Sequence, residues 1–176
     1  MTTITFKGIG IETVGKLPEK GSKAPEFTLV TGELSTKSLK DFAGKVVVLN
    51  IVPSLDTGIC ALSAQRFNKE AEALAKEHHD KLVVVNVSAD LPFAQSRFCE
   101  SLKLAHISNL SVFRSPEFGA SYGVTMKTGP LAGLLSRAVV VIDKEGIVRH
   151  SQQVPEIAKE PDYSSVLVDV KKLLLM

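Results

Sequence analysis

Two cysteines are the residues of this sequence best suited to covalent chemistry, and they are the only cysteines among its 176 residues. Cys60 follows the loop segment Pro53–Ile59, at the point where an amphipathic helix is predicted to begin. The opening turn of a helix offers unpaired N–H groups and a partial positive charge, which stabilise a thiolate relative to a thiol. This placement makes Cys60 a candidate nucleophile. The alternative is a small buried core residue, a role that free cysteines often have.

Two residues that precede Cys60 fit the surroundings of a nucleophile. Thr57 stands three residues earlier, so around a first helical turn its hydroxyl would face the sulfur and donate a hydrogen bond to an oxygen substrate. Threonine is also a common N-cap, and the two roles are compatible. Pro53 restricts the backbone where the preceding strand ends and would shield a thiolate from water, although a loop proline needs no such function.

Arg137 is a third candidate, at the start of the otherwise apolar segment Ser136–Val140. A charge at such a position either extends to solvent or meets an anion. If this strand lies beside the strand that leads to Cys60, the guanidinium points toward the thiolate and toward charge that develops on a substrate. The residues alone leave both possibilities open.

Cys99 lies in a second predicted helix, far outside the spacing of a CxxC pair with Cys60. This spacing disfavours a disulfide exchanger with adjacent cysteines. It suggests a division of labour, in which one cysteine is oxidised to a sulfenic acid and the other condenses with it to a disulfide. That bond needs Cα atoms within about 4.4–6.8 Å, so a larger separation in the reduced fold requires local unwinding. The alternative is that Cys99 is an unrelated core residue.

The elements that position these residues follow from hydrophobic patterning. Short apolar runs rich in β-branched residues predict three strands that are covered on both faces, Val46–Ile51, Leu82–Val87 and Ala138–Ile142. Between the first two, apolar residues recur every three or four positions and predict a helix over Ala61–Asp80. Its expected inward positions are Leu62, Phe67, Ala71, Leu74 and Ala75. Such a crossover normally joins parallel strands.

The remaining segments complete an α/β fold. Pro92–Leu102 predicts the helix that carries Cys99, and the turn Asp143–Gly146 followed by Ile147–Ser151 predicts a hairpin, which makes the sheet mixed. Ile4–Phe6 and Ile11–Thr13 predict a separate N-terminal hairpin. Ser164–Leu175 predicts a closing helix, with Val166, Val170, Leu173 and Leu174 inward. We expect one domain over residues 1–176, with helices on both faces of a mixed central sheet.

Composition excludes several classes of function. Hydrophobic residues make up 44% of the chain and charged residues 23%, as in globular proteins, and the net charge of +2 does not favour a nucleic-acid or membrane partner. No run of about 18 apolar residues and no secretory signal is present, so we expect a soluble, cytoplasmic protein. The histidines have no zinc-ligand spacing and no nucleotide-binding loop occurs, so no metal or cofactor is expected.

At this point the residues resemble a known family. Pro53, Thr57 and Cys60 match the PxxxTxxC motif of peroxiredoxins, and the flanking sequence is similar to the bacterial thiol peroxidase subfamily, the atypical two-cysteine type. The resemblance runs over nearly the whole chain, through the segments Phe6–Gly8, Phe42–Lys45, Ser88–Gln95, Gly129–Leu135 and Glu160–Tyr163.

The resemblance implies a thioredoxin-like fold with an added N-terminal hairpin. It implies that Cys60 is the peroxidatic cysteine and Cys99 its intramolecular resolving partner, and that Pro53, Thr57 and Arg137 shape and activate the peroxide pocket. It also implies a homodimer, reduction by thioredoxin, and hydrogen peroxide and organic hydroperoxides as substrates.

The leading hypothesis is therefore a thiol-dependent peroxidase. Two alternatives come from other classes. A peroxide sensor or redox relay would use the same cysteines but would turn over slowly without its partner protein. A structural interaction module with this fold would have a Cys60 of ordinary reactivity.

Overall fold

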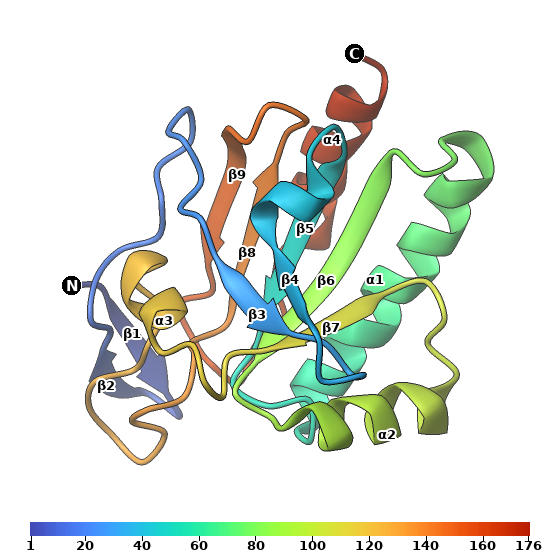
Figure 1. Cartoon of the computed structure of the whole chain (residues 1–176). Coiled ribbons are helices and arrows are strands. Elements are labelled where there is room, and N and C mark those ends of the chain that lie inside the picture. The colour runs from blue at the N-terminus through green and yellow to red at the C-terminus, as the bar shows by residue number, and fades with distance from the viewer.

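Seven strands form one central sheet in the computed structural model, which describes residues 1–176 (Figure 1). Their order across the sheet is β4-β3-β7-β6-β5-β8-β9. The bounds are β3 Thr28–Val30, β4 Thr36–Ser38, β5 Val46–Ile51, β6 Leu82–Ser88, β7 Ser108–Ser111, β8 Ala138–Ile142 and β9 Val148–Gln153. The three strands predicted from apolar runs are β5, β6 and β8, and they are neighbours at the centre of the sheet.

Strand β5 leads directly into the candidate site. It pairs in parallel with β6 and antiparallel with β8, with Ile51 opposite Val87 on one side and Ala138 on the other. All of its residues are buried, because both faces of the sheet are covered. Strand β9 pairs antiparallel with β8, so the prediction of a mixed sheet is confirmed.

Two hydrophobic clusters show which elements cover each face of the sheet. One contains Val46 and Val48 of β5 together with the inward residues of α1 (Gly58–Glu77) and α4 (Tyr163–Leu174). The other contains Val47, Leu49 and Ile51 together with residues of α3 (Glu117–Ser121) and of a 3-10 helix, Leu39–Phe42. Successive strand residues point to opposite faces of a sheet, so the two clusters lie on opposite faces. The sheet therefore has helices on both sides, as predicted.

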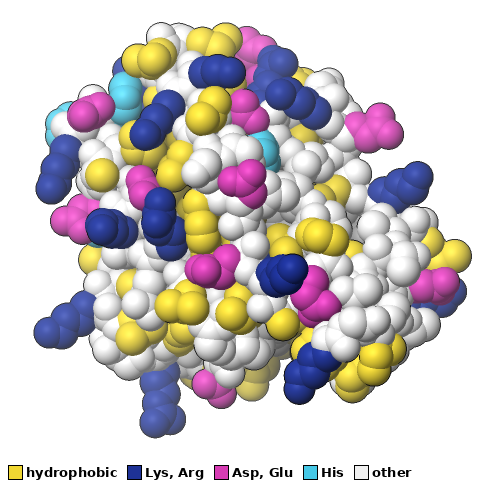
Figure 2. All heavy atoms as spheres, turned by 180° about the vertical axis from the view of Figure 1, so that it is seen from behind, with side chains coloured by type: hydrophobic (Ala, Val, Ile, Leu, Met, Phe, Trp, Pro, Cys, Tyr) yellow, Lys and Arg dark blue, Asp and Glu magenta, His cyan; other side chains and the backbone are white.

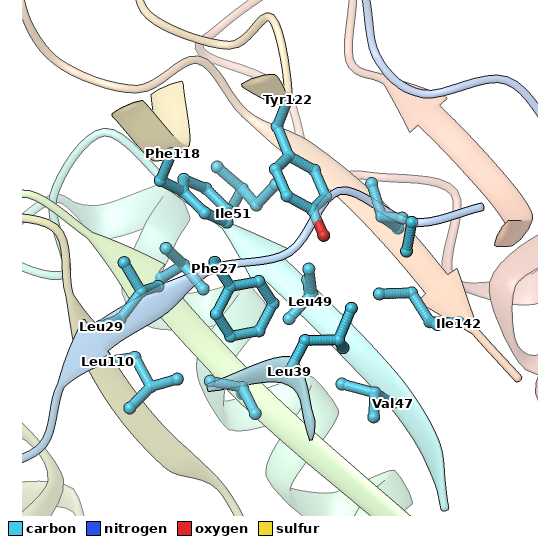
Figure 3. Close-up of a cluster of buried hydrophobic side chains, with 14 of the residues drawn as sticks. Phe27, Leu29, Leu39, Val47, Leu49, Ile51, Leu110, Phe118, Tyr122 and Ile142 are labelled. Atoms are coloured by element: carbon cyan, nitrogen blue, oxygen red, sulfur yellow. The ribbon is translucent and has the colours of Figure 1, made fainter. Parts of the chain in front are cut away.

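Three aromatic side chains meet within the largely aliphatic cluster beneath α3 (Figure 3). The rings of Phe118 and Tyr122 stack with centroids 4.4 Å apart, and Phe27 meets Phe118 edge-on at 5.7 Å. The buried Tyr122 hydroxyl donates to the carbonyl of Pro25 at 2.8 Å, so its polar atom is satisfied. This rigid layer supports the face of β5 that is turned away from α1.

Helix α1 begins three residues earlier than predicted, because Thr57 caps it and Gly58 is its first residue. Cys60 therefore lies within the first turn rather than before it. One predicted inward position is wrong: Leu62 is 49% exposed and lines a surface cleft. Ser63 and Ala64 are buried in its place, since the helix presents to the sheet a face that continues from Cys60.

Strands β3, β4 and β7 are not anticipated by the patterning of the sequence. Each has only three or four residues, too few to show a period, and β7 reads Ser-Asn-Leu-Ser. Helix α2 (Pro92–Leu102) has the predicted bounds and packs beside β7. The polar strand β7 is therefore the neighbour of the helix that carries Cys99.

The N-terminal hairpin is present as a separate two-stranded sheet, β1 (Thr3–Phe6) and β2 (Ile9–Glu12). Its two-residue turn needs positive φ at both central positions, which Lys7 and Gly8 adopt at 51° and 80°. The Glu156 carboxylate accepts hydrogen bonds from both turn amides and from the Thr5 hydroxyl. This carboxylate ties the hairpin to the segment that follows β9.

Charged side chains of both signs are interspersed over the face shown in Figure 2, with no large area of one sign. This distribution agrees with the small net charge of +2. None of the helices is both long enough and apolar enough to span a bilayer.

Candidate active site

The first turn of α1 holds Cys60 through its N-cap. The Cys60 amide donates to Thr57 Oγ1 at 3.4 Å, and the Thr57 hydroxyl donates to the carbonyl of Ser54 at 3.2 Å. The capping role considered for Thr57 is therefore present. The same side chain lines the cleft beside Cys60.

Arg137 reaches the sulfur of Cys60 from the neighbouring strand. Antiparallel pairing sets the start of β8 against the end of β5, and Arg137 immediately precedes β8. Its Nη1 donates to Cys60 Sγ at 3.2 Å, and its Nε donates to the carbonyl of Ile157 at 3.0 Å. Sequence reasoning left solvent or an anion as the partner of this guanidinium, and the fold directs it to the sulfur.

The charge of Arg137 has no carboxylate partner. The side chain is 2% exposed, so it does not extend to solvent, and none of the four ion pairs in the structure includes it. A guanidinium stays protonated in proteins, and a buried charge is strongly unfavourable without a partner. Among side chains, the Cys60 sulfur is the one that accepts a hydrogen bond from this guanidinium.

An apolar cleft of about 670 Å³ opens beside this pair. Its polar lining residues are Ser54, Thr57, Gln65 and Arg137, and the buried Pro53 also lines it. The apolar lining residues are Phe6, Pro53, Ile59, Ala61, Leu62, Leu131, Leu134, Ile157 and Ala158. Cys60 itself is fully buried, with its sulfur against the guanidinium that faces the cleft. The fold therefore brings Pro53, Thr57, Cys60 and Arg137 together.

Asp90 supports the loop between β5 and α1. Its carboxylate accepts from the Ser54 hydroxyl at 2.6 Å, from the Leu55 amide at 2.8 Å and from the Ser88 hydroxyl at 2.7 Å. These bonds join the loop to the end of β6, just before α2 begins. Asp90 is a supporting residue that the analysis of the sequence missed.

Cys99 has different surroundings. It is half-buried on α2, and Asn109 of β7 donates from Nδ2 to its sulfur at 2.9 Å. Burial raises the pKa of the Cys99 thiol, and the hydrogen bond from Asn109 acts in the opposite direction. Cys99 lines a separate hollow of about 360 Å³, and both cysteines are free thiols. In this state the fold does not join Cys99 to Cys60.

Comparison with known proteins identifies the family of this chain. A family model described as Redoxin matches residues 19–167. A thiol peroxidase of Mycobacterium tuberculosis is 48% identical over 167 residues, which cover 95% of this chain and 97% of that protein. The chain belongs to the thiol peroxidase branch of the peroxiredoxins. As a member of that branch, this peroxiredoxin is a peroxidase that works through a thiol.

Solved peroxiredoxin structures share its architecture. A peroxiredoxin-like protein from Aquifex aeolicus superposes with a TM-score of 0.90 at 40% identity, over 98% of each chain. A thiol peroxidase from Chromobacterium violaceum has a TM-score of 0.85 over 97% of this chain and 95% of that one, with 21% identity, which is a likeness of fold. The expected thioredoxin-like fold with an added N-terminal hairpin is confirmed.

Two features of this peroxiredoxin site were outside the reach of the sequence. Asp90 belongs to the segment Ser88–Gln95 that carries part of the family resemblance, but nothing in its spacing indicated which loop it contacts. Asn109 lies on a strand that the patterning did not detect. An acidic residue three positions after a predicted strand was the one signal available, since parallel strands end at the same edge of a sheet.

Proposed function

We propose that this peroxiredoxin reduces hydroperoxides through a Cys60 thiolate. The thiolate attacks the outer oxygen of the peroxide, the O–O bond breaks, and water or an alcohol leaves after taking up one proton. Cys60 is oxidised to a sulfenic acid, and the peroxide is reduced by two electrons. The observation that carries this proposal is the buried Arg137 guanidinium, 3.2 Å from the Cys60 sulfur and without an acidic partner.

Three neighbours are proposed to assist the attack. Arg137 stabilises the thiolate and then the charge that grows on the departing oxygen. The Thr57 hydroxyl donates to the bound peroxide after it turns away from the carbonyl of Ser54, its acceptor in this state. Pro53, buried in the wall of the cleft, keeps water from the sulfur. The apolar lining supports organic hydroperoxides as well as hydrogen peroxide as substrates.

Cys99 is proposed to resolve the sulfenic acid. Its thiol displaces water from the sulfenic acid of Cys60 and forms an intramolecular disulfide, which thioredoxin then reduces by thiol exchange. The Cys60 sulfur accepts a hydrogen bond from Arg137 and the Cys99 sulfur accepts one from Asn109, on different strands of the sheet, so local unwinding precedes the disulfide. We further propose that the protein acts as a homodimer in the cytoplasm, where thioredoxin keeps dithiols reduced.

Peroxide consumption with thioredoxin and its reductase tests this function, for both hydrogen peroxide and an organic hydroperoxide. Cys60→Ser should abolish turnover. Cys99→Ser should allow one oxidation and block cycling, and mass spectrometry of the oxidised unmutated chain should find Cys60 joined to Cys99. An active Cys60→Ser protein would disprove the proposal. Slow turnover that rises only when another oxidisable protein is added would favour the sensor or relay.

A further inference from the structure

Three asparagines occupy adjacent positions across the central sheet. Asn50 of β5 lies opposite Asn86 of β6, and Asn86 lies opposite Asn109 of β7. Asn50 Nδ2 donates to Asn86 Oδ1 at 2.9 Å, and Asn86 Nδ2 donates to Asn109 Oδ1 at 3.0 Å. We call these three residues the asparagine ladder. All of its amides donate in the same direction along the row.

The ladder ends at both cysteine-bearing helices. At one end Asn109 Nδ2 donates to the Cys99 sulfur at 2.9 Å. At the other end Asn50 Nδ2 donates to Ser63 Oγ at 3.3 Å, and the Ser63 hydroxyl donates to the backbone carbonyl of Cys60 at 3.0 Å. An unbroken row of hydrogen bonds therefore connects the Cys99 sulfur on α2 with the backbone carbonyl of Cys60 on α1.

This row is costly to bury. Asn50, Asn86 and Ser63 are fully buried, and Asn50 Oδ1 has no hydrogen-bond partner at all. A buried polar atom left unpaired costs roughly 1–3 kcal/mol, and apolar residues at these strand positions would avoid that cost. Because Asn109 Oδ1 already accepts from Asn86, the amino group of Asn109 is turned toward α2, where it donates to the Cys99 sulfur at 2.9 Å and to the Gln95 carbonyl at 3.4 Å. The shorter of these two bonds goes to the sulfur.

Disulfide formation must disturb one of the two sulfurs. Cys60 is held by Arg137 beside β8, whereas Cys99 is held by Asn109 on β7. Strands β6 and β5 lie between β7 and β8. The distance between β7 and β8 is therefore three inter-strand spacings, or roughly 14 Å. Helix α2 buries only Pro92 and Gln95, whereas α1 buries six residues, so α2 is the element that yields more readily.

We propose that Asn109 is a positioning residue that holds the reduced Cys99, so that its lost hydrogen bond makes the Cys60–Cys99 disulfide easier to reduce. The inference rests on the proposed function. When Cys99 leaves, the bond from Asn86 keeps Asn109 in place, and its amino group loses the 2.9 Å bond to the sulfur and retains the longer bond to the Gln95 carbonyl. The oxidised form bears that cost, and the reduced form does not. The disulfide takes two electrons and two protons on reduction, and the Cys99 sulfur regains its donor.

Redox equilibration of Asn109→Leu against dithiothreitol buffers is the first test. Leucine has a similar size and no donor, so the reduced form loses the hydrogen bond to the Cys99 sulfur that stabilises it relative to the disulfide. We expect the equilibrium to move toward the disulfide by about tenfold, which for two electrons is a potential lower by about 30 mV. Asn109→Asp keeps an oxygen that accepts from Asn86 and replaces the donor with a carboxylate. It should move the equilibrium in the same direction and further.

A second measurement separates this role from a general loosening of α2. In a Cys60→Ser background, the rate of Cys99 alkylation is followed against pH. Asn109→Leu should shift the profile to higher pH, because the thiolate loses its donor. Glu33, Lys37 and Glu100, the charged residues that share the hollow with Cys99, are unchanged in the variant. The control Ser101→Gly weakens α2 without touching the sulfur, so it should change the rate and leave the profile in place.

The outcomes are distinct. If the unmutated chain forms no Cys60–Cys99 disulfide, the proposed function fails. If the disulfide forms but Asn109→Leu changes the redox equilibrium by less than twofold, or leaves the alkylation profile where it was, the inference about Asn109 is overturned and the proposed function stands.

Discussion

Pairing between Arg137 and a Cys60 thiolate predicts an energetic coupling that a double-mutant cycle can measure. At 3.2 Å and an effective dielectric constant of about 20, two unit charges attract by about 5 kcal/mol. Desolvation of the buried sulfur opposes this attraction, and removal of one partner from a buried pair costs about 3–5 kcal/mol. We therefore expect Cys60→Ser to destabilise the reduced protein by about 3 kcal/mol, since the guanidinium stays buried without an anion.

The cycle uses Cys60→Ser, Arg137→Met and the double variant, each kept reduced and unfolded in urea at neutral pH. Arg137→Met also removes the hydrogen bond to the carbonyl of Ile157. That loss occurs in both backgrounds and cancels in the coupling energy. The double variant should recover most of the stability lost in Cys60→Ser, with a coupling of about 2–3 kcal/mol.

Additive effects of Cys60→Ser and Arg137→Met on the free energy of unfolding would refute the pairing of Arg137 with a Cys60 thiolate. If the coupling is below about 0.5 kcal/mol, which is the usual scatter for independent sites, Cys60 does not carry the charge that balances Arg137. The structural interaction module with a neutral, unreactive Cys60 would then describe the molecule better. Alkylation of Cys60 at neutral pH provides a check, because the coupling and the reactivity should be lost together in Arg137→Met.

Three further predictions concern the elements around the site. Gly58→Pro should slow disulfide formation several-fold. Proline suits the first helical position and a Cβ there meets open space, so the variant should unwind the first turn of α1 less readily. Gly58→Ala is the control, and an equal or faster rate for Gly58→Pro in stopped-flow oxidation would contradict this expectation. Asp90→Ala should lower the rate of peroxide reaction by about tenfold, because the Ser54 hydroxyl and the Leu55 amide of the loop before Cys60 lose their common acceptor. The control Ser88→Ala removes two hydrogen bonds outside that loop, one to Asp90 and one from Gln95, and should change the rate little. Hydrogen bonds from Thr5 and from backbone amides hold the pKa of Glu156 at about 2, below its ordinary value of 4.5, so anchoring of the hairpin is complete above pH 4.5 and is lost as pH falls toward 2. Pepsin cleavage of the hairpin should rise over that interval, and in Glu156→Gln it should be high throughout.

Local patterning was sufficient for much of this protein. The apolar runs identified the central strands β5, β6 and β8, and the helical period with Pro92 at its start identified α2 with its observed bounds. Cys60 was recognised as a candidate nucleophile from its place at a helix start. Each of these features depends on residues that are close in the sequence, where backbone geometry and hydrophobic period act directly.

Tertiary structure decided which distant residues share an environment. The acceptor of Arg137 depends on β8 lying beside β5, and the donor to Cys99 depends on β7 lying beside β6, an order that no local period encodes. Leu62 has helical spacing with the buried residues of α1 and is nevertheless exposed at the cleft. Tertiary structure decided this as well, because the packing of α1 against the sheet sets which of its faces is buried. Local sequence determined where the two cysteines lie on their helices and most of the scaffold around them. Strand order and register determined the partner of each sulfur, because hydrogen bonds across a sheet join residues that the chain itself keeps far apart.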